Sequence, residues 1–396
     1  MGVLTESFDA LVIGGGPVGG FAAQRIAEAG HSVAILEEHR EIGEPVQCGG
    51  IFTPRVMDMV DCRSTILTDI QGCEFYSPSG QELVVDGGET EAIVVDRAAF
   101  DREVVKGALQ AGAAAFLGTL ATSVERNGGD LLVHARGNGE AESFLCKVLI
   151  GADGVKGNVT GWFGLGRPYR ILPGFEADVV GAEYTPGYVK VFTGEAVAPG
   201  FFAWLVPGAH SARVGLCLGG GNARQYLDRM FTHGPPARFL AETQTLGYII
   251  GGIPIGVARR TYDEGVMIVG DAAYQAKATS GGGIFTGLVC AEACAQTAVE
   301  ALKRGDTSAA FLSRYQRRWK EAIGRELSLY LYLHKAFVKL SDPQLENLFT
   351  LLQNPRLLRI INEEGDIDFP GRAILALLKE EPRLLKFLGP AIRAVF

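Results

Sequence analysis

Three glycines close to the N-terminus, Gly14, Gly16 and Gly19, have the spacing G-x-G-x-x-G. An apolar run at residues 10–13 precedes them, and a segment with the composition of a helix follows up to Gly30. In a strand, turn and helix of this kind, the glycines permit a tight turn, close approach of the backbone to a pyrophosphate, and close packing of the helix on the strand. The phosphates bind at the N-terminus of the helix. The spacing therefore predicts a dinucleotide site.

An acid follows at the distance that such a site requires. After Gly30 a second apolar run ends in Glu37 and Glu38, about twenty residues beyond the middle glycine. A carboxylate at Glu37 would bind ribose hydroxyls rather than a ribose 2′-phosphate, so we expect FAD or NAD before NADP. An ordinary structural turn is the alternative. The strand, turn, helix, strand and acid nevertheless occur in the order of a binding unit, which favours the dinucleotide site.

A later strand end carries residues of the same kind. An apolar run ends in Gly270 and Asp271, and the triplet Gly281, Gly282 and Gly283 then opens a long Ala-rich helix. An acid there would contact a sugar-alcohol chain. The positive end of the helix would favour a reduced flavin, which carries negative charge near N1 and the C2 carbonyl.

Two further segments contain candidate contacts to the ligand. Residues 40–56 form a glycine-rich loop in which Cys48 and Gly49 could bring a thiol and bare backbone against a flat ring, although a buried, inert cysteine is equally compatible with the sequence. Arg97 begins a helix predicted to extend to residue 111, and it could reach a phosphate or a ribose. The alternative is an ion pair with Asp101, four residues later on the same helix face.

The composition excludes several classes of protein. A net charge of −8 argues against binding to nucleic acid, which requires a basic face. The seven cysteines form no C-x-x-C pair with metal spacing, so we predict no metal site and a reduced, cytoplasmic protein. The first strand begins within about ten residues, which leaves no room for a signal peptide. The apolar runs are shorter than the roughly eighteen residues of a spanning helix, so any membrane contact would be peripheral, at the inner face of the cell membrane.

The order of strand and helix patterns predicts an α/β protein. A Rossmann-like FAD-binding domain is interleaved with an α+β second domain, whose antiparallel sheet carries the substrate site. A helical, apolar segment completes the chain and is expected to cover that sheet. Near residues 383–393 this segment could be an amphipathic membrane contact or an ordinary packed helix. The predicted boundaries are 1–60, 91–168 and 259–325 for the FAD domain, 61–90 and 169–258 for the substrate domain, and 326–396 for the helical segment.

These motifs together resemble those of flavoprotein hydroxylases with the p-hydroxybenzoate hydroxylase fold. The resemblance rests on the glycine fingerprint with Glu37, the Asp96-Arg97 pair, the strand end Gly151-Ala-Asp-Gly154 and Gly270-Asp271. Within that group, the segments Glu41-Ile-Gly-Glu-Pro-Val-Gln-Cys-Gly-Gly and Pro199-Gly-Phe-Phe-Ala-Trp-Leu-Val-Pro are similar to those of the geranylgeranyl reductases of archaeal lipid synthesis. The likeness covers the whole chain and is weakest after Arg325. Phe202 and Ala278 depart from the pattern, at positions where relatives commonly have tyrosine and proline.

The resemblance implies a set of FAD contacts, all of which also fit the motifs above. They are the glycines of the turn and, in addition, Val18, Glu37, the backbone of Cys48, Gly49 and Ile51, Arg97, Ala121, Asp271, Gly281, Gly282, Gly283 and Ile284.

The activity implied is reduction of isolated C=C bonds in geranylgeranyl chains of a lipid precursor. An unconjugated alkene has no carbonyl to take up charge, so a proton must arrive at one carbon as hydride reaches the other, which requires an acid in an apolar tunnel. Cys48 could donate this proton or only shield the flavin. Trp204 is expected in the wall of the tunnel, with core packing as its alternative role.

Other functions remain open on the fold alone. A flavin monooxygenase acting on an aromatic compound or a quinone is one, and a flavoprotein that passes electrons to a quinone is another. No second dinucleotide fingerprint follows Gly154. The electron donor, whether NAD(P)H, a ferredoxin or a quinol, is therefore expected to visit transiently.

Overall fold

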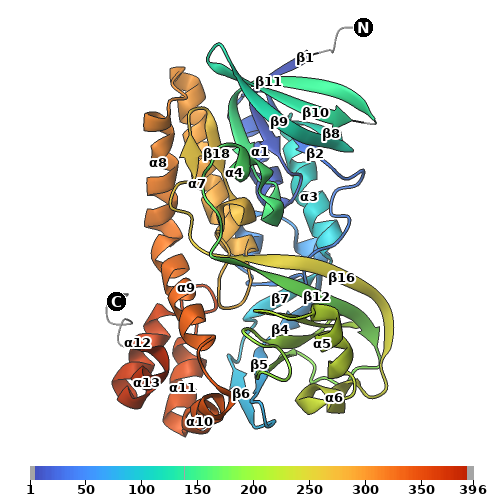
Figure 1. Cartoon of the computed structure of the whole chain (residues 1–396), viewed down its shortest axis with the longest axis vertical. Helices are drawn as coiled ribbons and strands as arrows, with labels where there is room; N and C mark the ends of the chain where they lie inside the picture. Colours follow the sequence, from blue (N-terminus) through green and yellow to red (C-terminus); the bar gives the residue numbers. More distant parts are fainter. Residues whose placement is uncertain (1–4, 138, 390–396) are drawn as a thin grey trace.

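The computed structural model describes residues 5–137 and 139–389. Two sheet regions follow one another along the long axis of the molecule, and the last helices of the chain lie beside the second region (Figure 1). The predicted α/β fold with a second, mainly antiparallel sheet is confirmed.

The first region is built on a sheet with the strand order β17-β18-β11-β1-β2-β8, in which β18, β11, β1, β2 and β8 are parallel. Strands β9 and β10 continue from β11 as an antiparallel meander. The bounds are β1 (Thr5–Ile13), β2 (Val33–Glu37), β8 (Ala114–Leu117), β9 (Thr119–Asn127), β10 (Asp130–Gly137), β11 (Glu140–Gly151), β17 (Tyr262–Asp263) and β18 (Val266–Ile268).

Both faces of this sheet are covered, which explains the continuous apolar runs of its strands. Helices α1 (Pro17–Glu28), α3 (Arg97–Gln110) and α7 (Ile284–Arg304) pack on one face, where they share a core with Ala10 and Val12. The meander covers the other face and packs on Leu11 and Ile13. The short helices α2 (Val56–Met59) and α4 (Asn158–Trp162) complete this region.

A small sheet joins the two regions. It has the order β3-β7-β4 and consists of β3 (Ile51–Phe52), β4 (Ile66–Ile70) and β7 (Ala92–Val95). Helix α3 follows β7 directly and begins after Asp96, whose side chain accepts a hydrogen bond from the backbone N–H of Ala99 at 3.0 Å. This N-cap confirms the predicted start of the helix at Arg97.

The second region is a seven-stranded sheet with the order β16-β12-β15-β14-β13-β5-β6. All its pairs are antiparallel except β13 with β5, and β5 and β6 form a hairpin. Helices α5 (Ala223–Met230) and α6 (Gly234–Leu240) cover one face. The strands are β5 (Gly72–Tyr76), β6 (Glu82–Asp86), β12 (Arg170–Val180), β13 (Tyr188–Phe192), β14 (Ala203–Pro207), β15 (Ala212–Cys217) and β16 (Gln244–Ile255).

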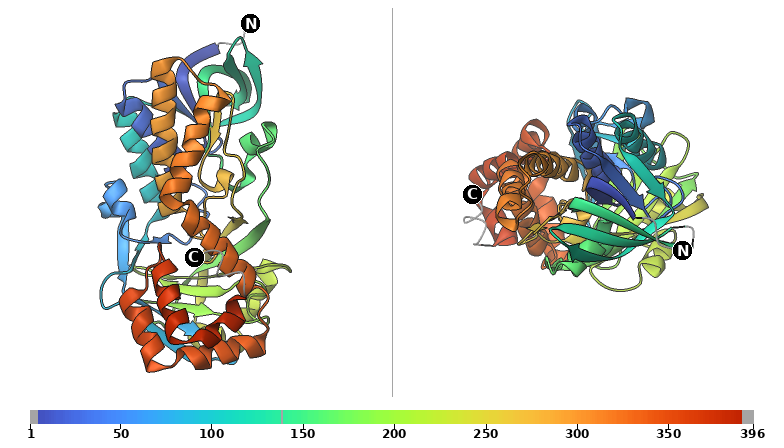
Figure 2. Two further views of the ribbon diagram at one scale, coloured as in Figure 1. Left: turned by 90° about the vertical axis from the view of Figure 1, so that its left-hand side faces the viewer. Right: turned by 90° about the horizontal axis from the view of Figure 1, so that it is seen from above.

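The C-terminal part is helical, as predicted. A long helical rod runs down the molecule through α8 (Ala309–Trp319), a π-helical turn (Lys320–Gly324) and α9 (Arg325–Phe337). Four shorter helices then gather at the end of the second region (Figure 2): α10 (Asp342–Leu352), α11 (Pro355–Glu364), α12 (Gly371–Glu380) and α13 (Leu385–Leu388). We call residues 342–388 the cap. Among the described residues, no helix is long and apolar enough to cross a membrane.

Candidate active site

The three glycines of the fingerprint meet different surroundings between β1 and α1. Gly14 has a φ of 109°, and a Cβ there would lie 2.3 Å from the Ala152 carbonyl oxygen. A Cβ on Gly19 would lie 2.1 Å from the carbonyl oxygen of Gly14. A Cβ on Gly16, in contrast, would meet no protein atom within 4 Å. Gly14 and Gly19 are therefore required by the turn itself, whereas the space at Gly16 is open at the helix N-terminus where a pyrophosphate binds.

Glu37 lies at this turn, at the end of β2. One oxygen of its carboxylate accepts a hydrogen bond from the backbone N–H of Gly15 at 2.7 Å. The other accepts from the backbone N–H of His39 at 2.9 Å and lies 2.6 Å from Nδ1 of the same histidine. The acid is thus held beside the phosphate-binding turn, where a ribose would follow the pyrophosphate.

A cavity of about 1150 Å³ starts at this turn and extends to the cap. This volume is larger than the roughly 300–1,000 Å³ of a typical ligand site, so the cavity has room for more than one small ligand. The predicted site residues that line it are Gly16, Val18, Gly19, Glu37, Cys48, Gly49, Ile51, Arg97, Trp204, Asp271, Gly281, Gly282, Gly283 and Ile284. Gly14 packs against the backbone of Ala152 and is not among the lining residues. Ala121 is buried in β9 and is not among them either, so a contact of Ala121 with FAD stays a prediction from the resemblance.

Asp271 and the glycine triplet lie together next to α7. A Cβ on Gly283 would lie 2.9 Å from Oδ1 of Asp271, so the triplet leaves room for this carboxyl group. Burial raises the pKa of Asp271 to about 6, and Arg97 acts in the opposite direction. The first turn of α7 contains no acidic residue. Its positive end therefore remains available to a negatively charged ligand.

Arg97 makes the ion pair that the helical spacing suggested. Its Nε and Nη2 donate to the two carboxylate oxygens of Asp101 at 3.1 and 3.0 Å. Burial raises the pKa of Asp101, and the guanidinium opposes this shift. Arg97 also lines the cavity. The ion pair with Asp101 therefore holds the arginine at the ligand site, and the predicted contact of Arg97 with the ligand stays possible.

The loop of Cys48 contacts both the small sheet and the second sheet. The Cys48 thiol accepts a hydrogen bond from the Gly50 N–H at 3.5 Å, and the Gly49 carbonyl oxygen accepts one from Nη1 of Arg213 at 2.6 Å. Gly50 has a φ of 69°, and a Cβ there would lie 2.7 Å from the Val95 carbonyl oxygen. Cys48 and Gly49 both line the cavity.

Trp204 and Glu176 contribute polar groups to the cavity wall next to this loop. Trp204 is half-buried in β14, and its indole Nε1 donates to Oε2 of Glu176 at 2.7 Å. A Cβ on Gly49 would lie 3.1 Å from the same carboxyl oxygen. Sequence reasoning missed Glu176. The only signal was a charged residue with apolar neighbours, Phe175 and Ala177, inside a predicted strand.

The far end of the cavity is apolar. Side chains of α9, of the short link after it and of the cap close it opposite the second sheet, including Leu333, Phe337, Leu340, Leu348, Phe349, Leu352, Ile374 and Leu377. The predicted covering of the substrate sheet by the C-terminal helices is present, and these helices also form part of the cavity itself. A long apolar chain would be desolvated there.

A group of polar contacts, which we call the latch, joins the cap to Lys277 and to the residues that follow β3. Nζ of Lys277 lies 2.8 Å from Oδ1 of Asp368, and both side chains are buried. Thr53 donates to Oδ2 of Asp368 at 2.6 Å, and Arg55 pairs with Asp368 at 3.3 Å and with Asp366 at 2.8 Å. The latch thus connects the cap to the segment after β3 and to the loop before the glycine triplet.

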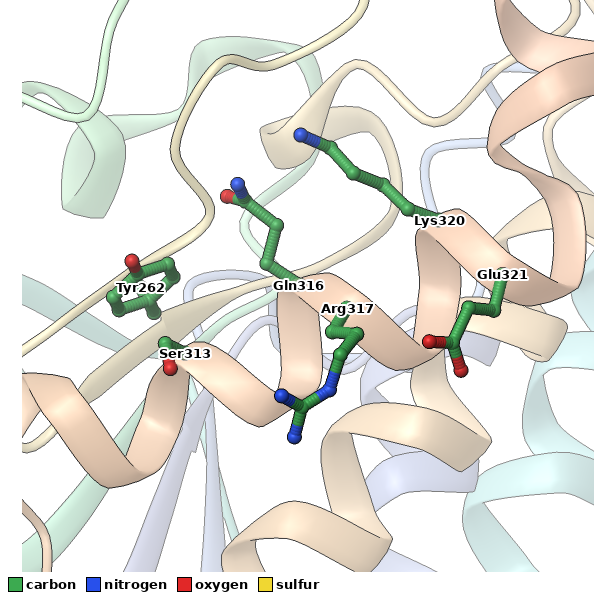
Figure 3. Close-up of a pocket in the computed structure, with 6 residues that line it drawn as sticks. All are labelled: Tyr262, Ser313, Gln316, Arg317, Lys320 and Glu321. Carbon is green, nitrogen blue, oxygen red and sulfur yellow. The ribbon is translucent and has the colours of Figure 1, made fainter.

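A smaller hollow of about 460 Å³ lies on the surface between β17 and the helical rod (Figure 3). It contains none of the glycine-rich strand ends, and we assign it no part in catalysis. Its lining residues are Tyr262, Ser313, Gln316, Arg317, Lys320 and Glu321.

Comparison with known proteins identifies the cofactor. Residues 7–180 match the family model of an FAD binding domain. The open space at Gly16, the acid at the turn, and the Asp271 and triplet region fit this dinucleotide, so FAD is the cofactor of the protein.

Relatives that match over nearly the whole chain identify the family more closely. The sequence is 32% identical to digeranylgeranylglycerophospholipid reductase of Methanothrix thermoacetophila, over 95% of this chain and 97% of the relative. It is 31% identical to the reductase of that name from Methanocaldococcus jannaschii, over 97% and 98%.

Solved structures agree with this assignment. A geranylgeranyl bacteriochlorophyll reductase-like protein of Thermoplasma acidophilum has a TM-score of 0.87 and 26% identity, with 99% of this chain and 100% of that chain covered. The p-nitrophenol 4-monooxygenase of Pseudomonas putida shares the fold alone, with a TM-score of 0.67, 17% identity and coverage of 97% and 98%. From the near full-length matches, the chain belongs to the digeranylgeranylglycerophospholipid reductase family of FAD-dependent oxidoreductases.

Proposed function

We propose that this protein reduces the isolated C=C bonds of geranylgeranyl chains in precursors of isoprenoid membrane lipids. The observation that carries the proposal is the continuity of one cavity from the flavin site to an apolar end closed by the cap. The names of the relatives, which match over nearly the whole chain, support the same lipid substrate.

The residues of the chain have distinct tasks in this reaction. When bound and reduced, FAD supplies hydride. The turn at Gly16, together with Glu37 and Asp271, holds the dinucleotide, and the N-terminus of α7 offsets negative charge on it. The apolar side chains of the cap hold the lipid chain and keep water out. Exclusion of water strengthens the electrostatic interactions between the protein and the reacting alkene.

The electron donor is proposed to visit transiently. The described part of the chain has one Rossmann-type glycine turn, and FAD accounts for it. A nicotinamide, a ferredoxin or a quinol would then reduce the flavin in a separate encounter. A lipid substrate further requires the protein to reach the inner face of the membrane, and we propose a peripheral contact for this step. Leu384 and Phe387 are buried, which favours ordinary packing for residues 383–389, and residues 390–393 lie outside the described residues.

The test is direct. The protein is reduced with dithionite, incubated anaerobically with digeranylgeranylglycerophospholipid, and the lipid is analysed by mass spectrometry. A gain of two hydrogens per double bond is the expected result. Electron transfer to a quinone with no change in lipid mass would instead support a quinone-reducing flavoprotein. Oxygen-dependent hydroxylation of an aromatic compound would support a monooxygenase.

Trp204 is expected to matter for turnover more than for folding. Its side chain lines the cavity and is only partly covered by protein. We expect Trp204→Ala to lower the rate of lipid reduction by roughly 10- to 100-fold, because the C=C bond would no longer be held in a single orientation in the cavity. FAD content and melting temperature should change little. A large fall in melting temperature with an unchanged rate would assign Trp204 to the core.

Cys48 is proposed to take part in turnover from the wall of the cavity. Cys48→Ser keeps the size of the side chain and removes thiol acidity, and Cys48→Ala removes the polar group. We expect both variants to slow lipid reduction while FAD content and reduction by dithionite stay unchanged. Loss of a proton donor typically lowers a rate by at least about 100-fold. We expect the rate of lipid reduction to fall by less than this in both variants. Wild-type rates in both variants would leave Cys48 as a backbone contact only.

A further inference from the structure

One row of residues crosses the second sheet on the side of the cavity. The register aligns Ile249 of β16 with Glu176 of β12, Glu176 with Gly215 of β15, and Gly215 with Trp204 of β14. The row continues through Val191, Phe75 and Leu83. Every member except Gly215 lines the cavity, and Glu176 is the only carboxyl group in the row.

Glu176 is buried without full hydrogen bonding. Its residue is 3% exposed, and Oε2 accepts the indole hydrogen bond of Trp204. Its other oxygen, Oε1, is buried and has no hydrogen-bond partner among the described residues. Leaving such an atom unpaired destabilises the fold, because the atom gives up its hydrogen bonds to water and gains none in return. A carboxyl kept in an apolar wall at this cost requires a reason other than packing.

The position of Glu176 suits a reaction at the border of flavin and lipid. Its carboxyl lies against Gly49, in the loop next to the glycine-rich flavin site. The rest of its row is apolar and leads toward the part of the cavity closed by the cap. An alkene bound along this row would lie beside the Glu176 side chain.

The surroundings of Glu176 also favour its neutral, proton-bearing form. Burial raises the pKa of the carboxyl group, while the Trp204 hydrogen bond and Arg213 act in the opposite direction. The titratable and charged groups that face it are Arg213 and Cys217 of β15 and Asp178 of its own strand, and Cys48 of the loop lies near Cys217. Asp178 adds to the upward shift.

We propose that Glu176 is the proton donor in reduction of the lipid double bond. This inference rests on the proposed function. The π bond of the alkene breaks, one carbon receives hydride from the reduced flavin, and the other receives the proton of the Glu176 carboxyl group. The flavin is oxidised, the alkene is reduced, and Glu176 remains as a carboxylate that takes a proton from solvent before the next turnover.

Trp204 is a positioning residue in this scheme. Its indole ring occupies the space that a side chain at position 215 would fill, since a Cβ on Gly215 would lie 2.7 Å from Cε2 of the ring. The missing side chain lets Trp204 reach across β15 to Glu176. The hydrogen bond fixes Oε2, so the register of three strands holds the carboxyl group of the proposed donor in the wall of the cavity.

The test compares Glu176→Gln with the wild type and with Cys48→Ala. Glutamine keeps the size of the side chain and an oxygen that can accept from Trp204, but it has no acidic proton. We expect a fall of at least about 100-fold in lipid reduction. FAD content and reoxidation of the reduced flavin by ferricyanide, which needs no proton donor to a carbon, should be unchanged. In the wild type the rate should fall as the pH rises through the raised pKa of the carboxyl group, and this alkaline limb should be absent from Glu176→Gln.

An infrared measurement tests the donor without turnover. The oxidised holoenzyme should show the carbonyl band of a buried protonated carboxylic acid, and Glu176→Gln should lack it. Trp204→Phe removes the indole N–H and keeps an aromatic ring, so it should shift this band.

The outcomes separate this inference from the proposed function. Reduction of lipid by Glu176→Gln at the wild-type rate would overturn the inference and leave the function intact, and a severe loss in Cys48→Ala alone would then assign the proton to the thiol. Failure of the wild type to reduce lipid would reject the function, whereas absence of the infrared band would count against the donor itself.

Discussion

A Gly16→Val protein is expected to purify folded but without FAD, whereas the wild type should be yellow with noncovalently bound FAD. The valine side chain would enter the open space at the start of α1, where no protein atom lies within 4 Å of the added Cβ. The fold therefore tolerates the side chain, and the pyrophosphate does not. Absorbance of the purified protein, and release of FAD on heating, measure the effect.

The matched control is Gly247→Val. Gly247 lies in β16, has open space around it, and does not line the cavity, so its variant should keep full FAD content. Gly14→Val would be uninformative, because its Cβ would collide with the backbone of Ala152. Full flavin content in Gly16→Val, or release of FMN from the wild type, would contradict the assignment of the turn.

The second large effect is expected at the latch. Asp368→Ala leaves Lys277 as a buried charge without its carboxylate, which typically costs about 3–5 kcal/mol. It also removes the acceptor of Thr53 and one partner of Arg55. We expect the free energy of unfolding in urea to fall by this amount, and proteolysis to attack the cap first.

Two companion variants identify the cause. Lys277→Met should cost less than Asp368→Ala, because Asp368 keeps its contacts with Thr53 and Arg55. The double variant Lys277→Met/Asp368→Leu should recover part of the loss, since an apolar pair replaces the buried charges. Equal stability of Asp368→Ala and the wild type would show that the cap is held by its apolar contacts alone.

The flavin half of the site could be predicted because its signals are local. The turn at Gly16, the acid at Glu37 and the triplet before Ile284 each combine a strand end with a helix start inside a short segment. The predicted α/β fold follows from the same strand and helix patterns. The structure brings these segments together along one cavity, and their contacts with FAD stay predictions.

The substrate half could not be predicted in the same way. Glu176 and Trp204 meet only because three strands align in register across Gly215, and no local pattern fixes such a register. The contact between Lys277 and Asp368 joins residues separated by 91 positions. A helix period predicts that the C-terminal segment is helical, but it does not say that the segment closes a cavity or which loop it meets.

The order of the cavity walls along the chain has a consequence for synthesis on the ribosome. Helix α7, whose N-terminus belongs to the flavin site, ends at Arg304, whereas Asp368 of the latch follows 64 residues later. Both sheets of the cavity also precede Arg304. At about 5–20 residues per second, the translating ribosome needs roughly 3 to 13 seconds to cover this interval. During that time the segments of the flavin site have been made and the cap has not, so we expect that FAD can bind before the last helices close the cavity.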